Sequence, residues 1–414
     1  MKKIVLSSIV ASSVVMAGGY KIPEASLNAV ALSAANVAHV KTADAAYYNP
    51  ANMVFMSDEN HLEADVKYIG LDSINYKGSY KDKFTNESGL DLDSESEDFL
   101  VPSLHYVSGK LGNARVGVSL VSPGGLSKRW TENPAKGVAE EFTLEIIEFN
   151  PTVALPVTDT VAVAFGFRIV HSSGIVKSDK GSPTNISRDM TGESTDFGYN
   201  LALSYKPTKA LEFGLTYRSR VNLTQDGDAK LYNSALGPAP YNEASYDGSA
   251  QVTVPLPATF SAAIAYTLSS ATTIEFVYEN TQWSAYENLD FSYSEPLGSA
   301  ILIGAFDKPV SKDWKDSNTY RLGITQELTS MTLMGGVVYD ESPVPDSSLS
   351  FELPDSNSLA FSLGGRYHVS DKLDLGLAAL YSTRESRTAD NDSLDGEFTD
   401  GNVLIVSAGL GYKF

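Results

Sequence analysis

The sequence predicts an all-β membrane protein: a 14-stranded antiparallel outer-membrane β-barrel with a small N-terminal helical hatch that plugs the lumen. Three observations lead to this fold class. The chain closes on an alternating strand that ends in a large aromatic residue, earlier segments alternate in the same way, and short turns alternate with long polar loops. Each observation is weak alone, because a soluble sheet also alternates, but their combination favours a barrel.

The closing segment, residues 403–414, has one apolar face and one face that is mostly small or polar. The apolar face consists of Leu404, Val406, Ala408, Leu410, Tyr412 and Phe414. This ending resembles the terminal signal through which the barrel-assembly machinery recognises outer-membrane barrels, so we expect that machinery to bind at Phe414. The alternative is an edge strand of a soluble sheet.

The N-terminus reads as an export signal. Lys2 and Lys3 precede a short apolar run that is too short to span a membrane, and small residues follow at the cleavage positions. We therefore assign residues 1–17 to a signal peptide, cleaved before Gly18 or, as second choice, before Tyr20. Loss of the two lysines takes the formal charge from −20 to −22, which makes nucleic acid an unsuitable partner. With 0 cysteines, the exported chain is no disulfide scaffold.

Residues 60–414 divide into strand-like segments with regular connections. Short turns are expected near 109–113, 156–159, 207–209, 269–271, 329–330 and 370–371. Long polar loops are expected at 73–97, 123–141, 173–193, 223–247, 285–316, 341–356 and 386–401. Residues 248–268 could form two strands or one strand broken by its prolines. One strand keeps the count even and both chain ends on the periplasmic side, so we adopt it; closure then falls on a first strand near residues 61–71.

Residues 18–59 do not alternate. After Pro23, residues 24–40 have helical spacing of small and apolar side chains at Leu27, Val30, Ala31, Ala34 and Val37. The segment is either a periplasmic tail or a plug. We favour a plug, because a barrel of this width leaves an opening.

Several motifs resemble the FadL family of outer-membrane transporters for long-chain fatty acids and other hydrophobic compounds. The family's Asn-Pro-Ala hatch motif, preceded by an aromatic residue, is matched by Tyr47, Tyr48, Asn49, Pro50 and Ala51. Further matches lie at 122–126, 256–259, 283–284, 339–345 and 353–355. The resemblance implies a plugged 14-stranded barrel in the outer membrane of a Gram-negative bacterium, surrounded by lipid and lipopolysaccharide. We expect a monomer without cofactors.

The resemblance also implies a mechanism. A hydrophobic cargo is captured at the loops, passes the hatch and leaves sideways through an opening in the wall. No phosphate-binding loop supplies energy, so we expect passive movement. Fatty acids are the family's default cargo, and relatives carry aromatic hydrocarbons.

The loops depart from the family's pattern, because the third one, 173–193, is short and polar where well-known members have a long apolar loop. We therefore expect the fourth and fifth loops to supply the external capture surface. The candidate residues are Leu231, Tyr232, Leu236, Tyr241, Ile301, Leu302 and Ile303.

Three groups of residues are candidate sites inside the barrel. A strand kink that opens the wall is expected at Ser122, Pro123, Gly124 and Gly125, since proline lacks a donor and glycine bends freely; the alternative is an ordinary turn. Cargo carboxylates are expected at Arg168, Arg218, Arg321 and Arg366, with lumen salt bridges to Glu212, Glu327 or Asp374 as the alternative. The Asn-Pro-Ala motif is either a moving hatch element or a structural turn.

Other readings receive little support. Residues 91–95 alternate carboxylates without the glycine of a calcium loop, so a solvated acidic loop is favoured. The 5 histidines show no metal-ligand spacing, and no metal site is expected. An outer-membrane enzyme would need a catalytic motif, and the sequence contains none. A general porin would conduct ions steadily, and a soluble β-protein would be released from membranes by mild salt.

Overall fold

The computed structural model describes residues 18–83, 85–182, 185–234, 244–268 and 271–414. The predicted signal peptide, residues 1–17, lies outside the described residues, as do the candidate capture residues Leu236 and Tyr241. Within the described ranges, no helix is both long enough and apolar enough to cross a membrane.

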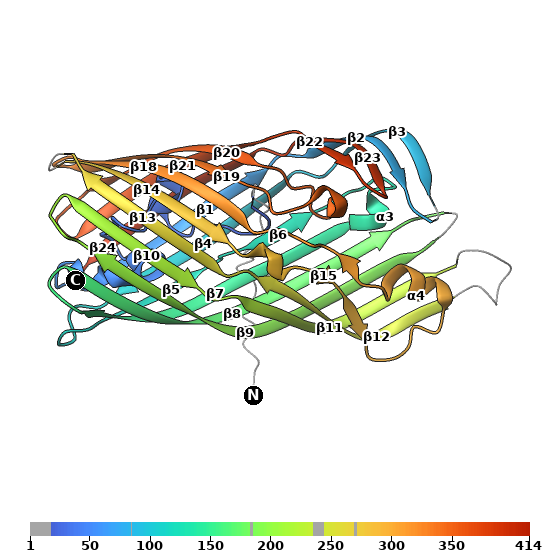
Figure 1. Cartoon of the computed structure of the whole chain (residues 1–414), viewed down its shortest axis with the longest axis horizontal. Coiled ribbons are helices and arrows are strands. Elements are labelled where there is room, and N and C mark those ends of the chain that lie inside the picture. The colour runs from blue at the N-terminus through green and yellow to red at the C-terminus, as the bar shows by residue number, and fades with distance from the viewer. Residues whose placement is uncertain (1–17, 84, 183–184, 235–243, 269–270) are drawn as a thin grey trace.

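The predicted fold class is confirmed: the strands close into a 14-stranded antiparallel barrel (Figure 1). Most positions around the barrel hold one strand each. These strands are β1 (His61–Leu71), β4 (Glu97–Val107), β7 (Glu141–Pro156), β8 (Val161–Asp179), β9 (Ser187–Tyr205), β14 (Thr272–Thr281), β18 (Ser317–Glu327), β19 (Met331–Asp340), β20 (Ser358–His368), β21 (Leu373–Arg384) and β24 (Val403–Lys413).

The remaining barrel positions are each shared by two consecutive strands with an interruption between them. They hold β5 (Arg115–Val121) with β6 (Gly125–Lys128), β10 (Leu211–Arg218) with β11 (Val221–Asn233), and β12 (Ala244–Leu256) with β13 (Thr259–Thr267). The last pair settles the ambiguity at residues 248–268. Because β12 pairs with β11 and β13 pairs with β10, they form one strand position broken at Pro257–Ala258, as predicted.

The closing strand β24 pairs with the first strand along its whole length, from His61 opposite Lys413 to Leu71 opposite Val403. Its predicted apolar face points outward: Leu404 is 41% exposed whereas Ile405 is 0% exposed. An outward apolar face suits lipid and would be unfavourable in water, which excludes the soluble edge strand. The C-terminus lies at the end of the barrel opposite to α4 (Figure 1).

The short turns expected within the described residues are confirmed, whereas residues 269–270 of the turn expected at 269–271 lie outside them; several expected loops contain strands. Two of the expected loops contain a separate four-stranded sheet, made of β2 (Ile74–Lys81), β3 (Asn86–Asp93), β22 (Arg387–Asp390) and β23 (Leu394–Asp400). Most of the expected loop at 173–193 belongs to β8 and β9, and most of that at 223–247 to β11 and β12. These predictions were wrong because the strands beyond the lipid have one face in water, and the apolar residues of their inner face, such as Ile74, Tyr76 and Leu231, stand among many charged and polar residues.

The connection between β14 and β18 contains short elements. They are η2 (Trp283–Ala285), β15 (Asn288–Leu289), β16 (Phe291–Tyr293), α4 (Ala300–Phe306) and β17 (Val310–Ser311). Strand β16 pairs with β12, so the connection returns to the barrel wall. Two further elements in connections are α3 (Lys136–Ala139) and η3 (Asp346–Ser348).

The N-terminal segment, residues 18–59, lies inside the barrel. It contains α1 (Leu27–Ala31), α2 (Ala45–Tyr48) and η1 (Pro50–Phe55); α1 contacts β19, β20, β21 and β24, whereas η1 contacts β5, β7, β8 and β9. The predicted helix over 24–40 was too long. Ser33 and Ala34 adopt positive φ angles of 49° and 58°, which end the helix and redirect the chain along the wall.

The fit of this segment to the wall predicts a steric test at Gly336. A Cβ atom there would meet the backbone of Leu32, whereas the atom nearest to a Cβ at neighbouring Gly335 would be the flexible end of Leu363, at 3.3 Å. We expect Gly336→Ala to lower the free energy of unfolding by about 1–3 kcal/mol through overpacking. Gly335→Ala is the matched control. Thermal unfolding in detergent measures both, and equal melting temperatures would contradict the packing of the segment against β19.

Candidate functional site

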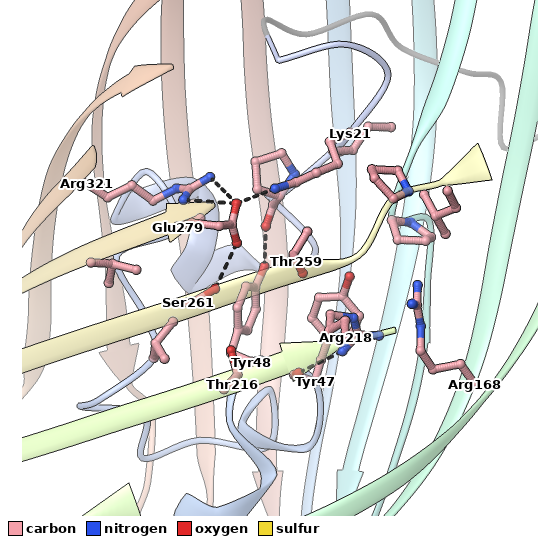
Figure 2. A pocket seen from close by; sticks show the side chains of 18 residues that line it. Lys21, Tyr47, Tyr48, Arg168, Thr216, Arg218, Thr259, Ser261, Glu279 and Arg321 are labelled. Atoms are coloured by element: carbon pink, nitrogen blue, oxygen red, sulfur yellow. Dashed lines mark hydrogen bonds and ion pairs between the residues drawn. The ribbon is translucent and has the colours of Figure 1, made fainter. Parts of the chain in front are cut away.

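A cavity lies between the N-terminal segment and the barrel wall (Figure 2). We call it the lumen chamber. Its lining includes Lys21, Tyr47, Tyr48, Pro123, Arg168, Arg218, Pro257, Glu279 and Arg321. It therefore brings together three groups that the sequence singled out separately: the aromatic pair of the hatch motif, the proline of the expected kink and three of the four candidate arginines.

The hatch motif holds the N-terminal segment together and to the wall. Tyr48 donates its hydroxyl to the Pro23 carbonyl oxygen at 2.7 Å and accepts a hydrogen bond from the Ala25 amide at 2.7 Å. The Asn49 side chain donates to the carbonyl oxygens of Val37, at 2.9 Å, and Leu203, at 3.3 Å. Since Asn49 is 0% exposed, these bonds are shielded from water and fix the turn that Pro50 continues as η1.

Arg168 and Arg218 share one carboxylate. Glu148 on β7 is 0% exposed and accepts hydrogen bonds from Arg168 Nε at 3.0 Å and Nη2 at 2.8 Å, while its other oxygen accepts one from Arg218. The Arg218 guanidinium also lies 4.1 Å from the centre of the Tyr47 ring, a cation–π contact. Two cations on one carboxylate leave a surplus positive charge at this side of the chamber.

The opposite side of the chamber repeats this arrangement. Glu279 on β14 accepts hydrogen bonds from Lys21, from both terminal nitrogens of Arg321 at 3.3 Å, and from Ser261 at 3.0 Å (Figure 2). The nearby Glu24 offsets part of this surplus. It is buried in the N-terminal segment, and burial raises its pKa to about 7, so near neutral pH it is only partly ionised.

The fourth arginine lies elsewhere. Arg366 pairs with Glu63 and donates to Asn28 Oδ1 at 2.6 Å, beneath α1. All four arginines thus form lumen salt bridges, but none has the partner expected from the sequence. The expected acids Glu212, Glu327 and Asp374 instead pair with His39 and Lys206, with Lys41, and with His368, respectively. Sequence periodicity assigned these acids to the lumen face. It does not give their depth along the barrel axis, and that depth decides which arginine each acid can reach.

The barrel wall is interrupted where the kink was expected. Strand β4 pairs with β5 only from Leu104 to Val107, and β6 pairs with β7, so residues 97–103 of β4 have no ladder partner on the β6 side in the described chain. Residues 20–22 of the N-terminal segment lie along this break. The Ile22 amide donates to the Pro123 carbonyl oxygen at 2.9 Å, and the Gly125 amide donates to the Tyr20 carbonyl oxygen at 2.8 Å.

Gly124 is required for this close approach, since a Cβ atom there would lie 2.7 Å from the Tyr20 carbonyl oxygen. Ser122 occupies the interruption with Pro123 and Gly124, and Gly125 begins β6. The predicted residues therefore do break the strand, and the N-terminal segment supplies the hydrogen-bond partners that the neighbouring strand does not.

A second cavity is lined by Tyr20, next in sequence to Lys21 of the lumen chamber. We call it the outer cavity. Its walls are mainly apolar and come from β6–β8, β12 and the connections 282–316 and 341–357; they include Leu126, Leu144, Val254, Leu289, Phe291 and Trp314. The ion pair Lys312–Glu352 lies at its edge. Sequence analysis missed this site, because its lining combines residues of several strands with residues of two connections that lie far apart in the sequence.

The candidate capture residues divide into surface and core. Ile303 is 40% exposed on α4 and Tyr232 is 37% exposed on β11, with Ile301 partly buried. Leu231 and Leu302 are buried in the core that surrounds the outer cavity, so they support this surface from below. Within the described residues, no group of three histidine or acidic side chains could hold a metal ion.

A closed antiparallel barrel with an outward apolar face, a lumen segment and internal cavities defines an outer-membrane transport protein. Residues 8–414 match the family model of the outer membrane protein transport proteins (OMPP1/FadL/TodX), and the chain belongs to that family. The family transports hydrophobic compounds across the outer membrane and is not a family of enzymes.

Individual relatives are distant. A long-chain fatty acid transport protein of Escherichia coli O6:H1 is 24% identical over 350 residues, covering 76% of this chain and 77% of the relative. The crystal structure of a Pseudomonas aeruginosa FadL homologue superimposes with a TM-score of 0.83 at 19% identity, covering 96% of this chain and 100% of that one. The Pseudomonas putida toluene transporter TodX gives a TM-score of 0.72 at 14% identity, with 95% and 99% covered. At these identities the structural likenesses establish the fold alone.

The shared carboxylate predicts the effect of Glu148→Gln. The substitution leaves two buried guanidinium groups without their counter-charge, and we expect the free energy of unfolding to fall by about 3 kcal/mol. Glu193→Gln, on an exposed position of β9, is the control and should change little. Denaturant unfolding in detergent measures both variants. An E148Q protein as stable as the control would show that Arg168 and Arg218 do not depend on Glu148.

Proposed function

We propose that this chain carries long-chain fatty acids across the outer membrane by passive diffusion, with residues 18–59 acting as a hatch. The observation that carries the proposal is the lumen chamber. It adjoins both the N-terminal segment and the wall break at Pro123, and its arginines outnumber the carboxylates that pair with them. The relatives named as long-chain fatty acid transport proteins support the choice of cargo.

The proposed path begins at the exposed apolar side chains of α4 and β11. A hydrocarbon chain leaves water there and moves into the outer cavity, where burial of apolar surface stabilises it by roughly 25 cal/mol per Å². The next space is the lumen chamber. Tyr20 lies in the lining of the outer cavity, and Lys21 and Ile22 lie in that of the chamber, so residues 20–22 must shift for the cargo to pass.

The same shift opens the proposed exit. Two backbone hydrogen bonds join residues 20–22 to Pro123 and Gly125 at the interrupted strand. Beside these bonds, β4 and β6 are not paired with each other. When the segment withdraws, the break connects the chamber to the membrane. The cargo then leaves sideways into lipid, which avoids transfer of its hydrocarbon chain into water. The Asn49–Pro50–Ala51 turn keeps the rest of the hatch fixed during this movement.

A fatty-acid carboxylate would be held in the chamber by the arginines that share Glu148 and Glu279. The Glu148 site has one carboxylate for two cations, so an incoming carboxylate completes its charge balance without displacing a side chain. At the Glu279 site, the nearby acids Glu24 and Asp340 reduce the positive charge of Lys21 and Arg321. Neutral aromatic hydrocarbons are the alternative cargo. They are favoured by the observation that all four candidate arginines already have a partner.

The exit can be tested by sealing each of two wall breaks in turn, since both Pro123 and Pro257 border the chamber. The double variant Pro123→Val/Gly125→Thr restores strand-forming residues between β5 and β6. We expect it to reduce uptake of a radiolabelled C18 fatty acid by cells at least about tenfold, because a continuous ladder closes the exit. The matched control, Pro257→Val/Ala258→Thr, alters the break between β12 and β13 and should transport normally. Undiminished uptake by the first variant, at equal surface expression, would refute lateral exit at Pro123.

Cargo charge can be tested with a C18 fatty acid, the corresponding hydrocarbon and toluene. We expect the purified protein to bind the acid at least about tenfold more tightly than the hydrocarbon, and Arg218→Gln to remove most of that difference. Tryptophan fluorescence titration and mass spectrometry of co-purified ligand measure this preference. Equal binding of acid and hydrocarbon, or bound aromatic hydrocarbon, would favour the neutral cargo instead.

A further inference from the structure

The wall break between β4 and β6 is closed by backbone contacts at both of its ends. At the periplasmic end, the ladder between β4 and β5 begins at Leu104. At the outer end, the Glu95 amide donates to the Arg129 carbonyl oxygen at 2.9 Å, and Ser94 forms an isolated antiparallel bridge with Trp130. The break is therefore a window of limited height, and we call it the exit window.

The β4 edge of the exit window is poor in backbone donors. The Ser108 amide donates to the Val116 carbonyl oxygen at 2.8 Å, so this amide points toward β5. Amides that point to the same neighbour recur at every second residue of an antiparallel strand, which places Asp98, Leu100 and Pro102 on the window side. Because Pro102 has no N–H group, the middle of the edge cannot complete a ladder. Closure of the window therefore depends on other groups.

Side chains join the two edges just below the outer end of the exit window. Glu97 on β4 is buried and accepts hydrogen bonds from the Ser127 hydroxyl on β6, at 2.5 Å, and from the Arg129 guanidinium. Lys128, also buried on β6, donates to the Ser94 hydroxyl oxygen at 3.3 Å. These bonds cross the window where β4 and β6 are not paired in the described chain. We call Glu97, Ser127 and Arg129 the window latch.

The two carboxylates bound to Arg129 differ in what they connect. Glu141 begins β7 and accepts a hydrogen bond from Arg129 at 2.7 Å. Since β7 pairs with β6, this bond stays on one side of the exit window. The bond to Glu97 crosses it, and burial of Glu97 shields that charge-assisted bond from water. The crossing bond therefore resists separation of the two edges, whereas the bond to Glu141 does not.

We propose that the window latch sets the width of the exit and so decides how bulky a hydrophobic molecule can leave the lumen chamber. An unbranched alkyl chain passes between edges that stay joined at Glu97 and Arg129. A wider ring system requires the edges to separate and the latch to break. The inference rests on the proposed lateral exit at Pro123, and it adds the residues that select cargo by its cross-section.

Hydrogen exchange in detergent tests the latch without any cargo. Glu97→Ala removes the carboxylate that crosses the window, and the matched control Glu141→Ala removes the other partner of Arg129. We expect the Glu95 amide to exchange at least about tenfold faster in E97A than in wild type and E141A, because the outer end then opens more often. The Ser108 amide, in the ladder beyond the window, should be unchanged. Equal exchange at Glu95 in all three proteins would overturn the proposal.

Selection by width is tested in cells with an unbranched C18 fatty acid and a C18 fatty acid that carries a terminal pyrene ring. The measured quantity is the ratio of pyrene-acid uptake to plain-acid uptake at equal surface expression. We expect E97A to raise this ratio at least about tenfold over wild type, and E141A to keep the wild-type ratio. An unchanged ratio in E97A, even with faster exchange at Glu95, would overturn the role of the latch in selection.

Two further variants make the outcome decisive. If E97A fails to assemble, Arg129→Gln removes the other half of the ion pair and should shift both measurements in the same direction; wild-type values would contradict the latch. Adding Pro123→Val/Gly125→Thr to E97A seals the exit, so the gain for the pyrene acid should disappear. A gain that persists would mean that bulky cargo leaves elsewhere and would overturn the inference. Failure of the transport proposal is distinguishable, because wild type would then take up neither acid while the exchange result at Glu95 would stand.

Discussion

The structure depends on one contact more than on any other: the hydrogen bonds between residues 20–22 and the interrupted strand at Pro123 and Gly125. A barrel wall in lipid tolerates unpaired backbone groups only where other protein groups satisfy them. Here the N-terminal segment does so from inside the lumen, and Gly124 leaves room for it. The wall and the N-terminal segment are therefore one hydrogen-bonded unit, and the wall is closed at Pro123 only while the segment is bonded there.

Charge inside the lumen follows a second constraint. Glu148 and Glu279 are each shared by two basic side chains, so each of the three chamber arginines has a partner, and the Glu148 side of the chamber keeps a surplus positive charge. Such sites can accept an anion transiently, since its binding costs no ion pair. The outer cavity, in contrast, is walled by apolar side chains. A molecule with an apolar chain and one carboxylate would meet the matching surface in each cavity, and the family's transport of hydrophobic compounds agrees with this order of sites.

Sequence reasoning predicted the barrel well, because membrane-level strands alternate with a period of two and the terminal strand could be followed residue by residue to Phe414. It failed where that signal is absent. The outer strands β2, β3, β22 and β23, whose apolar residues stand among many polar ones, were assigned to loops, and the helix after Pro23 was extended past Ser33. It also identified the chamber arginines but not their partner acids. Alternation shows which face a residue occupies, but it does not show which residues of neighbouring strands lie at the same height in the barrel.

The most direct test of the account is hydrogen exchange at the Ile22 and Gly125 amides, which donate across the wall break. The account predicts slow exchange of both amides in the free protein and much faster exchange when a C18 fatty acid is added, with the amide of Val406 in the continuous ladder between β21 and β24 unchanged. Protection of Ile22 and Gly125 that stays the same during transport would contradict it, because the cargo would then cross without moving the segment that closes the wall.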